Sequence, residues 1–248
     1  MVKISSSSNS FKWPLALLFV VVLASSGCLK TTPTSPNSKV QLNYVFESGT
    51  EGWQAGFSDY PANLSSSDSL DLYGLSYGFS VLPVTVIPIQ SGIRIKGFNR
   101  SDDLFMYLKK KITGLLPNTN YKISYLIEIA SNVPTNATGA GGAPGEAVTV
   151  KAGAKNIEPV NTVDASNYYR LNIDKGNQSV GGKDMIPIGN VGVTDTTTRY
   201  TLIRRANSTP LVKSTNSFGE LWLIVGTDSG FEGLTDIYYG SIKVLLEQ

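Results

Sequence analysis

The sequence predicts an all-β protein, a β-sandwich of the jelly-roll type. Residues typical of strands and tight turns (Tyr, Thr, Val, Ile, Gly, Ser and Asn) are abundant, and no long stretch shows the apolar spacing of a helix. Short runs with strand character recur, separated by turns that contain Gly, Asn, Pro and Asp. About nine to eleven strands of this length fit a jelly-roll sandwich, which can form as one domain over residues 40–248.

The beginning of the chain has the pattern of a secretory signal sequence. Lys3 and Lys12 supply positive charge, and an apolar run of roughly 11 residues follows over 14–24, which suits a signal peptide and is too short to span a membrane. Small residues then precede Cys28, the single cysteine of the chain. We therefore expect residues 1–27 to be a signal peptide.

The stretch Ser25-Ser26-Gly27-Cys28 resembles the lipobox of bacterial lipoproteins, with a departure at Ser25, where a leucine is usual. The resemblance implies cleavage before Cys28 and attachment of acyl chains such as palmitate, and several chains together anchor a protein firmly. The membrane is then one partner, and the cell envelope is the expected location. The position after Cys28 is Leu29, where an aspartate would resemble an inner-membrane retention signal. The absence of that aspartate favours the outer membrane in a Gram-negative cell. A plain signal peptide with a stray cysteine and an uncleaved anchor are the alternatives.

Residues 28–39 are expected to form a tether. Ser, Thr and Pro dominate this stretch, and nothing from Lys30 to Lys39 is apolar. Such a segment buries too little surface to offset the entropy of ordering it.

The expected strands follow from alternation of apolar and polar residues. They are Val40–Glu47, Gly92–Phe98, Asp103–Ile112, Tyr121–Ala130, Ala147–Ala152, Tyr168–Ile173, Arg199–Arg205, Leu221–Val225 and Ile237–Leu246. Pro83 and Pro88 exclude a central strand over Val81–Ile89, which is predicted as an edge strand or an extended loop. Ser58–Gly78, Asn132–Glu146 and Gly176–Gly182 are expected to be irregular or loops.

Composition excludes several classes of function. Histidine is absent, which excludes the usual Ser-His-Asp and Cys-His chemistry and His-ligated zinc or copper. The net charge is only +2 and there is no basic block, so nucleic acid is not an expected partner. A single cysteine leaves no intrachain disulfide to stabilise the core.

Three short motifs resemble galactose-binding-like jelly rolls, the fold of many carbohydrate-binding modules. Phe46-Glu47-Ser48-Gly49 with Glu51-Gly52-Trp53 is similar to the opening strand and loop of those modules, and 114–121 is similar to their Gly-Leu-x-Pro-x-Thr-x-Tyr pattern. The stretch 236–244 is similar to the closing strand, although Gly240 or Ser241 stands where an aspartate is usual. The resemblance spans most of residues 42–246 and implies a non-catalytic carbohydrate-binding domain.

The same resemblance implies a structural calcium ion held by Glu47 and Asp236. Calcium takes six to eight oxygen ligands, so two carboxylates do not specify it. The alternative is a solvated glutamate and a turn aspartate.

Aromatic residues after the first strand are the candidate ligand-binding residues: Trp53, Tyr60, Tyr73 and Tyr77. Loops of a sandwich often carry its function, and the apolar face of a sugar stacks on an aromatic ring. The alternative is that Trp53 and Phe79 plug the end of the sandwich. Trp222 lies inside an apolar strand and is predicted to be a core residue.

Acidic loops leave a catalytic hypothesis open. A glycosidase needs only two carboxylates, and the stretch Asp228-Ser-Gly-Phe-Glu232 is either a turn with polar caps or a loop that supplies carboxylates. We expect no catalytic residue and no certain cofactor. The prediction is a lipid-anchored, non-catalytic ligand-binding sandwich; the alternatives are a structural or adhesive envelope protein that binds another protein, and a carboxylate-dependent glycan hydrolase.

Overall fold

The computed structural model describes residues 39–194 and 198–248. The predicted signal peptide, Cys28 and the tether up to residue 38 therefore lie outside the described residues and stay predictions. Among the described residues no helix is long and apolar enough to cross a membrane.

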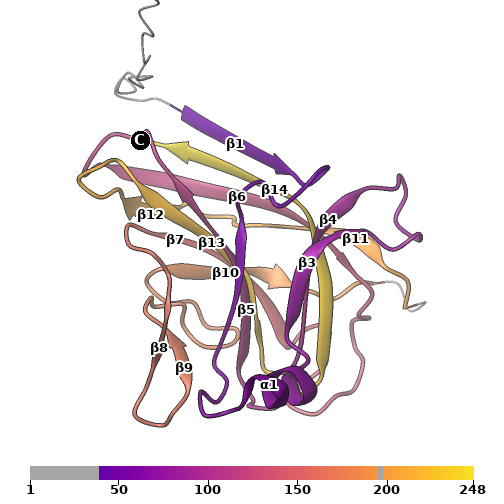
Figure 1. Ribbon diagram of the computed structural model, residues 1–248. Helices are drawn as coiled ribbons and strands as arrows, with labels where there is room; N and C mark the ends of the chain where they lie inside the picture. The colour runs from indigo at the N-terminus through magenta and orange to yellow at the C-terminus, as the bar shows by residue number, and fades with distance from the viewer. Residues whose placement is uncertain (1–38, 195–197) are drawn as a thin grey trace, which may run out of the picture. The chain divides into compact units, whose positions relative to one another are not determined.

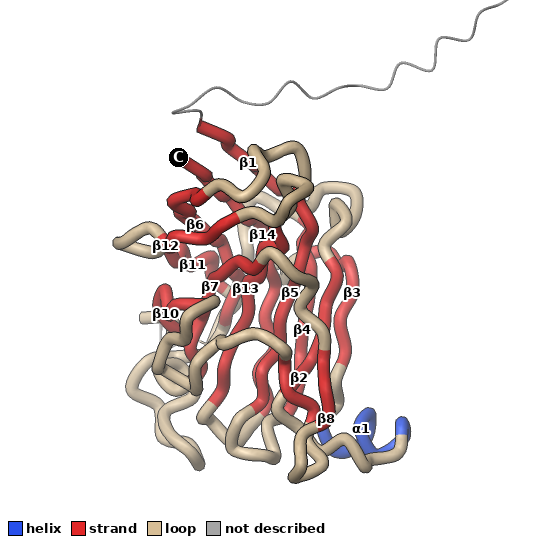
Figure 2. The backbone as a smooth tube through the Cα atoms, turned by 90° about the vertical axis from the view of Figure 1, so that its left-hand side faces the viewer, coloured by secondary structure: helices blue, strands red, loops and turns tan. Residues whose placement is uncertain are grey.

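Residues 39–248 form two antiparallel sheets that pack face to face (Figures 1 and 2). The larger sheet contains seven strands: β1 (Lys39–Val45), β3 (Ser76–Val81), β4 (Ser91–Phe98), β6 (Asn120–Ser131), β11 (Thr201–Ala206), β12 (Leu211–Ser214) and β14 (Leu234–Glu247). The smaller sheet contains five: β2 (Gln54–Ser58), β5 (Leu104–Ile112), β7 (Val148–Lys155), β10 (Met185–Asn190) and β13 (Leu221–Ser229). A hairpin of β8 (Asn161–Val163) and β9 (Tyr169–Leu171) and a short helix, α1 (Ser66–Tyr73), complete the described elements.

The strand order is that of a jelly roll. The larger sheet contains the order β11–β6–β14–β4, and the smaller contains β10–β7–β13–β5. The chain passes from one sheet to the other between β4 and β5, β5 and β6, and β6 and β7, and again between β10 and β11, β12 and β13, and β13 and β14. Such crossing between two antiparallel sheets is how jelly rolls pair distant strands. The predicted all-β jelly-roll sandwich is confirmed.

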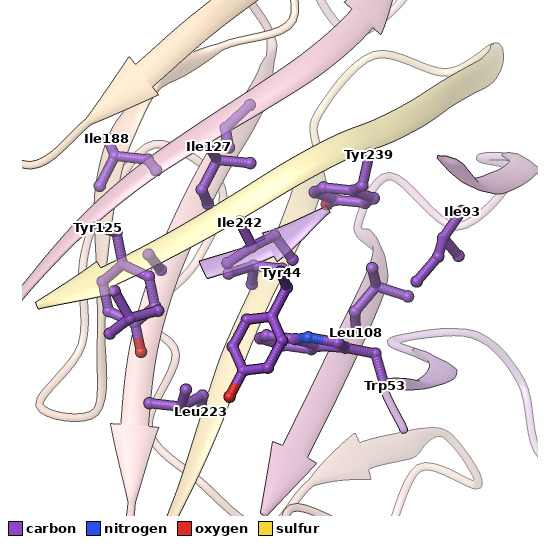
Figure 3. Packing of buried hydrophobic residues seen from close by; sticks show 14 of the residues in the cluster. Tyr44, Trp53, Ile93, Leu108, Tyr125, Ile127, Ile188, Leu223, Tyr239 and Ile242 are labelled. Atoms are coloured by element: carbon purple, nitrogen blue, oxygen red, sulfur yellow. The ribbon is translucent and has the colours of Figure 1, made fainter. Parts of the chain in front are cut away.

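The core lies between the sheets and is built from alternate residues of each strand (Figure 3). Ile127, Tyr239 and Ile242 enter it from the larger sheet, and Leu108 and Leu223 enter it from the smaller. All five are buried, and each fully buried side chain of this size contributes roughly 1.5–3 kcal/mol. With one cysteine in the chain, this apolar layer is the main source of stability.

The longer expected strands are present, whereas several short elements were missed. The stretch Ser58–Gly78, predicted to be irregular, contains α1 and the beginning of β3, and β2, β8, β10 and β12 were not expected. Val81 ends β3, which is an edge strand, and residues 82–90 form a loop, as Pro83 and Pro88 predicted. The predicted strand over Tyr168–Ile173 is shorter in the structure and belongs to the β8–β9 hairpin.

Candidate functional site

The long connection between β7 and β10, residues 156–184, covers part of the outer face of the smaller sheet. Phe105 and Tyr107 of β5 point outward there, and their rings stack with centroids 5.5 Å apart. Ile173 from the connection packs with them and with Ile224 of β13. This connection thus creates a second, smaller apolar layer outside the main core.

A buried ion network joins the connection to the sheet. Lys151 of β7 and Asp228 of β13 are both fully buried, with 2.7 Å between Nζ and Oδ2. Lys151 also donates to the carbonyl oxygens of Lys175 and Val180, at 2.9 and 2.8 Å. Groups that are buried in this way can remain charged when they are paired with an opposite charge and hydrogen-bonded.

Lys175 extends the network toward the surface. Its ammonium lies 2.9 Å from Asp228 Oδ2, 3.0 Å from Asp59 Oδ2 and 3.9 Å from Asp103 Oδ1. Burial lowers the pKa of Lys175, but the carboxylates of Asp228, Asp59 and Asp103 outweigh burial, and the net pKa is raised. Lys175 is therefore charged and fixes three carboxylates around one ammonium group.

A pocket of ≈ 260 Å³ opens where this network reaches the surface. We call it the Arg170 pocket, and its lining residues are Asp59, Asp103, Arg170, Leu171, Ile173, Asp174, Lys175, Gly176 and Asn177. The Arg170 side chain, which is 40% exposed, lies 2.8 Å from Asp59 through Nη1 and 3.0 Å from Asp164 through Nε. With its amide nitrogen turned toward Asp103, Asn177 donates to both carboxylate oxygens, at 3.0 and 3.1 Å. The pocket combines fixed polar groups with the apolar side chains of Leu171 and Ile173.

Asp103 has the most unusual titration in the pocket. Burial raises its pKa from 3.8 to about 7; the neighbouring carboxylates of Asp228 and Asp59 act in the same direction, and Lys175 opposes them. The carboxyl of Asp103 therefore exchanges a proton near neutral pH, so it is a hydrogen-bond donor in one state and an acceptor in the other.

The cluster also has a donor set that could hold a metal ion. Carboxylate oxygens of Asp59, Asp103 and Asp228 lie within 4.8 Å of one another, and this is the only such group among the described residues. Asp228 Oδ1 is buried and has no hydrogen-bond partner in the described part of the chain. Calcium prefers oxygen ligands of this kind. Its entry would require Lys175 to move, since the ammonium now supplies the positive charge.

The predicted calcium pair lies elsewhere. Glu47 is exposed just after β1, and Asp236 of β14 forms a bidentate ion pair with Arg94, in which Nε donates to Oδ1 at 2.8 Å. Neither residue belongs to the carboxylate cluster. A calcium role for Glu47 and Asp236 stays a prediction.

The four predicted aromatic residues do not form one exposed surface. Trp53 is 3% exposed and packs edge-on against Tyr44 at 5.4 Å, so its ring belongs to the core. Phe79, the other residue of the end-plug alternative, is 44% exposed, so the alternative is wrong for Phe79. Tyr73 is also buried, beside half-buried Tyr60 at 5.7 Å. Tyr77, by contrast, is 58% exposed on edge strand β3.

Trp222 was wrongly predicted to be a core residue. Its neighbours Leu221 and Leu223 point into the core, which turns Trp222 to the outer face of the smaller sheet. There it is half-buried, with the ammonium of Lys109 5.3 Å from the ring centre.

Sequence reasoning missed most of the pocket. Of its residues and the network beneath it, only Asp228 stood in a stretch that was flagged as a source of carboxylates. Lys151 offered a signal, since a lysine in the middle of an apolar strand needs a buried partner. Nothing local distinguishes Asp59, Arg170 or Lys175 from ordinary loop residues.

Comparisons with known proteins return structural neighbours only. No family model matches the chain, and no curated protein matches it. One solved structure concerns carbohydrate-binding modules of the β-sandwich superfamily; it has 12% identity and a TM-score of 0.40, and the match covers 79% of this chain and 58% of that one. A module that recognises mannan has 11% identity and a TM-score of 0.37, with 84% and 98% covered.

An adhesin domain of Lys-gingipain from Porphyromonas gingivalis is similar to a comparable degree. It has 12% identity and a TM-score of 0.34, and the match covers 84% of this chain and 98% of that domain. Sequence identities and TM-scores this low assign neither a family nor a ligand to this chain.

Proposed function

We propose that this chain is a lipid-anchored envelope protein whose jelly-roll domain binds a small polar ligand, a saccharide, in the Arg170 pocket without catalysis. The observation that carries the proposal is the lining of that pocket. Arg170, Asp59 and Asn177 present charged and amide groups beside Leu171 and Ile173. A sugar matches such a site, because its hydroxyl groups pair with fixed polar groups while its C–H face contacts apolar side chains.

Two features of the sequence support the anchoring and the ligand class. The stretch that ends at Cys28 resembles a lipobox, and the motifs around Phe46, 114–121 and 236–244 resemble carbohydrate-binding jelly rolls. Five carboxyl groups, those of Asp59, Asp103, Asp164, Asp174 and Asp228, stand against three cations, those of Lys151, Arg170 and Lys175. This excess of acidic groups disfavours an anionic ligand and is compatible with a neutral saccharide.

A glycan-array screen of residues 39–248, with and without a calcium chelator, tests the proposal. A saccharide hit should be lost in Arg170→Gln and kept in Tyr77→Ala, because Tyr77 is exposed on β3 and does not line the pocket. Phe218→Ala, at a side chain that is 78% exposed, controls for general loss of a surface aromatic ring. If the chelator abolishes saccharide binding, calcium is part of the binding site.

A clean array from folded protein would instead favour the alternative, an envelope protein whose partner is another protein. A hit lost in Tyr77→Ala but kept in Arg170→Gln would move the ligand to β3 and overturn the assignment of the pocket.

Hydrolysis is the second candidate function, and the raised pKa of Asp103 favours it, because a carboxylic acid that is protonated near pH 7 can act as a general acid. Against it, the ammonium of Lys175 occupies the space between the carboxylates of Asp59 and Asp228. Any release of reducing sugar from a bound glycan should then disappear in Asp103→Asn. Binding without release would leave the non-catalytic proposal in place.

A further inference from the structure

The loop that joins β3 to β4, residues 82–90, presents aliphatic side chains to solvent. Val84, Ile87 and Ile89 are 82%, 83% and 74% exposed. Isolated exposed apolar residues are common on proteins, but three aliphatic residues within six positions are not scattered. Figure 1 shows the loop projecting from the side of the sandwich.

The loop is held in place from below. Leu82 and Val86 are 3% exposed and pack with Ala130 and Tyr238 on the outer face of the larger sheet. The hydroxyl of Thr85 donates to the carbonyl oxygen of Tyr200 at 3.0 Å. The buried side chains of Leu82 and Val86 therefore hold the loop against the sheet, while Val84, Ile87 and Ile89 remain exposed to solvent.

The apolar character continues into edge strand β3. Tyr77, Phe79 and Val81 are 58%, 44% and 58% exposed, and they lie on one side of the strand. No charged residue occurs between Asp71 and Arg94. An edge strand normally carries charges that prevent association, and this one has none.

We propose that the loop 82–90 is a membrane-contact surface, which inserts Val84, Ile87 and Ile89 into the boundary between lipid headgroups and acyl chains. The partner is a lipid bilayer. Segments that lie in the membrane interface insert apolar side chains, and the loop 82–90 presents three exposed aliphatic side chains and contains no charged residue. Protein interfaces instead concentrate Trp, Tyr and Arg at their centre, and none of these three residue types occurs in the loop 82–90.

The length of chain before the domain favours the bilayer over other partners. Ten residues, 29–38, separate Cys28 from Lys39, so even a fully extended chain spans only about 40 Å. This argument depends on acylation of Cys28, which belongs to the proposed function. A domain held that close meets the bilayer at a high effective concentration, and a weakly inserting loop is then sufficient.

Flotation of residues 39–248 with vesicles tests the surface without the anchor. This segment contains every strand of both sheets and both layers of the core, so it is a complete folding unit. We expect measurable binding to phosphatidylcholine vesicles, reduced at least tenfold in Ile87→Ser/Ile89→Ser, since burial of one aliphatic side chain is equivalent to roughly tenfold in partition. Because the stretch is uncharged, binding should be insensitive to added phosphatidylglycerol and to salt.

The matched control is Val163→Ser/Val180→Ser, at two valines that are 55% and 66% exposed outside the loop; its binding should equal that of the parent. A tryptophan placed by Ile87→Trp should shift its emission to the blue when vesicles are added. No vesicle binding by the parent, or equal binding by the Ile87/Ile89 variant, overturns the proposal. A dimer in sedimentation that the same variant abolishes also overturns it, and assigns the surface to a second copy of the chain.

The outcome is separable from that of the proposed function. Vesicle binding does not involve the Arg170 pocket, so a clean glycan array leaves the membrane surface intact. Loss of vesicle binding likewise leaves a saccharide hit intact.

Discussion

At the scale of single residues, Lys151 and Asp228 depend most strongly on each other, because both charged groups are fully buried and form an ion pair. We expect Asp228→Asn to lower the free energy of unfolding by about 3–5 kcal/mol, since Lys151 and Lys175 then lose a charged partner. Urea unfolding followed by tryptophan fluorescence measures this loss. The double change Lys151→Met/Asp228→Leu should recover part of it, and an unchanged midpoint in Asp228→Asn would show that the pair does not stabilise the fold.

Asp103 gives the same network a pH dependence. Its pKa is raised to about 7 in the fold, so between pH 4 and pH 7 the folded state binds more protons than the unfolded state. Its contribution to stability is therefore present at low pH and declines as the pH rises toward 7, by at most about 1.4 kcal/mol per pH unit.

Asp103→Asn should remove this decline. The measurement is the free energy of unfolding of both proteins from pH 4 to pH 8, compared as a difference, so that the contributions of other groups cancel. A constant difference across that range would contradict the raised pKa.

At the scale of elements, Asn207 repairs a break in a strand ladder. β11 and β12 both pair with β6, and the ladder stops between Leu126 and Ile123. Asn207 fills the gap: its Oδ1 accepts from the Tyr125 amide at 2.6 Å, and its Nδ2 donates to the Ile123 carbonyl at 3.1 Å. One side chain thus replaces the missing backbone partners.

Asn207→Ala should cost about 1–3 kcal/mol, because it leaves a backbone donor and acceptor of β6 without partners. Thermal unfolding measures the loss. Asn207→Asp should lower stability less, since it keeps the acceptor for the Tyr125 amide. Thr209→Ala, at an exposed neighbour, should leave the stability unchanged. Equal stability of Asn207→Ala and the parent would mean that water replaces the amide.

Elements were predictable where one face of a strand is buried. The alternation in Tyr121–Ala130 identified β6, in which buried residues alternate with more exposed ones over most of the strand. β2 and β12 are short and carry few apolar residues, so their strand conformation depends on pairing with β5 and β6 rather than on local pattern. Pro83 and Pro88 located a loop correctly, because proline cannot donate a hydrogen bond to a strand ladder. No local pattern in the sequence predicted helix α1.

At the scale of the whole molecule, the candidate site could not be predicted, because the fold assembles it from distant positions. Asp59 follows β2, Asp103 precedes β5, Asp228 lies near the end of β13, and Arg170 and Lys175 lie in the connection 156–184. Only the jelly-roll pairing of β5, β13 and β7 brings these segments together. The sequence placed ligand binding on aromatic residues, and the fold buries Trp53 and Tyr73 instead.

Lys175 is one of several groups that attach the connection 156–184 to the sandwich, together with Ile173 and Arg170. Lys175→Met removes the ammonium that joins Asp59 and Asp228, while Lys151 still neutralises Asp228 in the sheet. We expect amide exchange within 161–180 to accelerate at least about tenfold, with protection of β5 and β13 retained, because local opening requires less free energy than global unfolding. Lys39→Met, which removes an exposed ion pair with Glu247, is the control and should leave exchange in the connection unchanged. If exchange in β5 and β13 rises equally, the connection and the sandwich open together, and the pocket is as stable as the core beneath it.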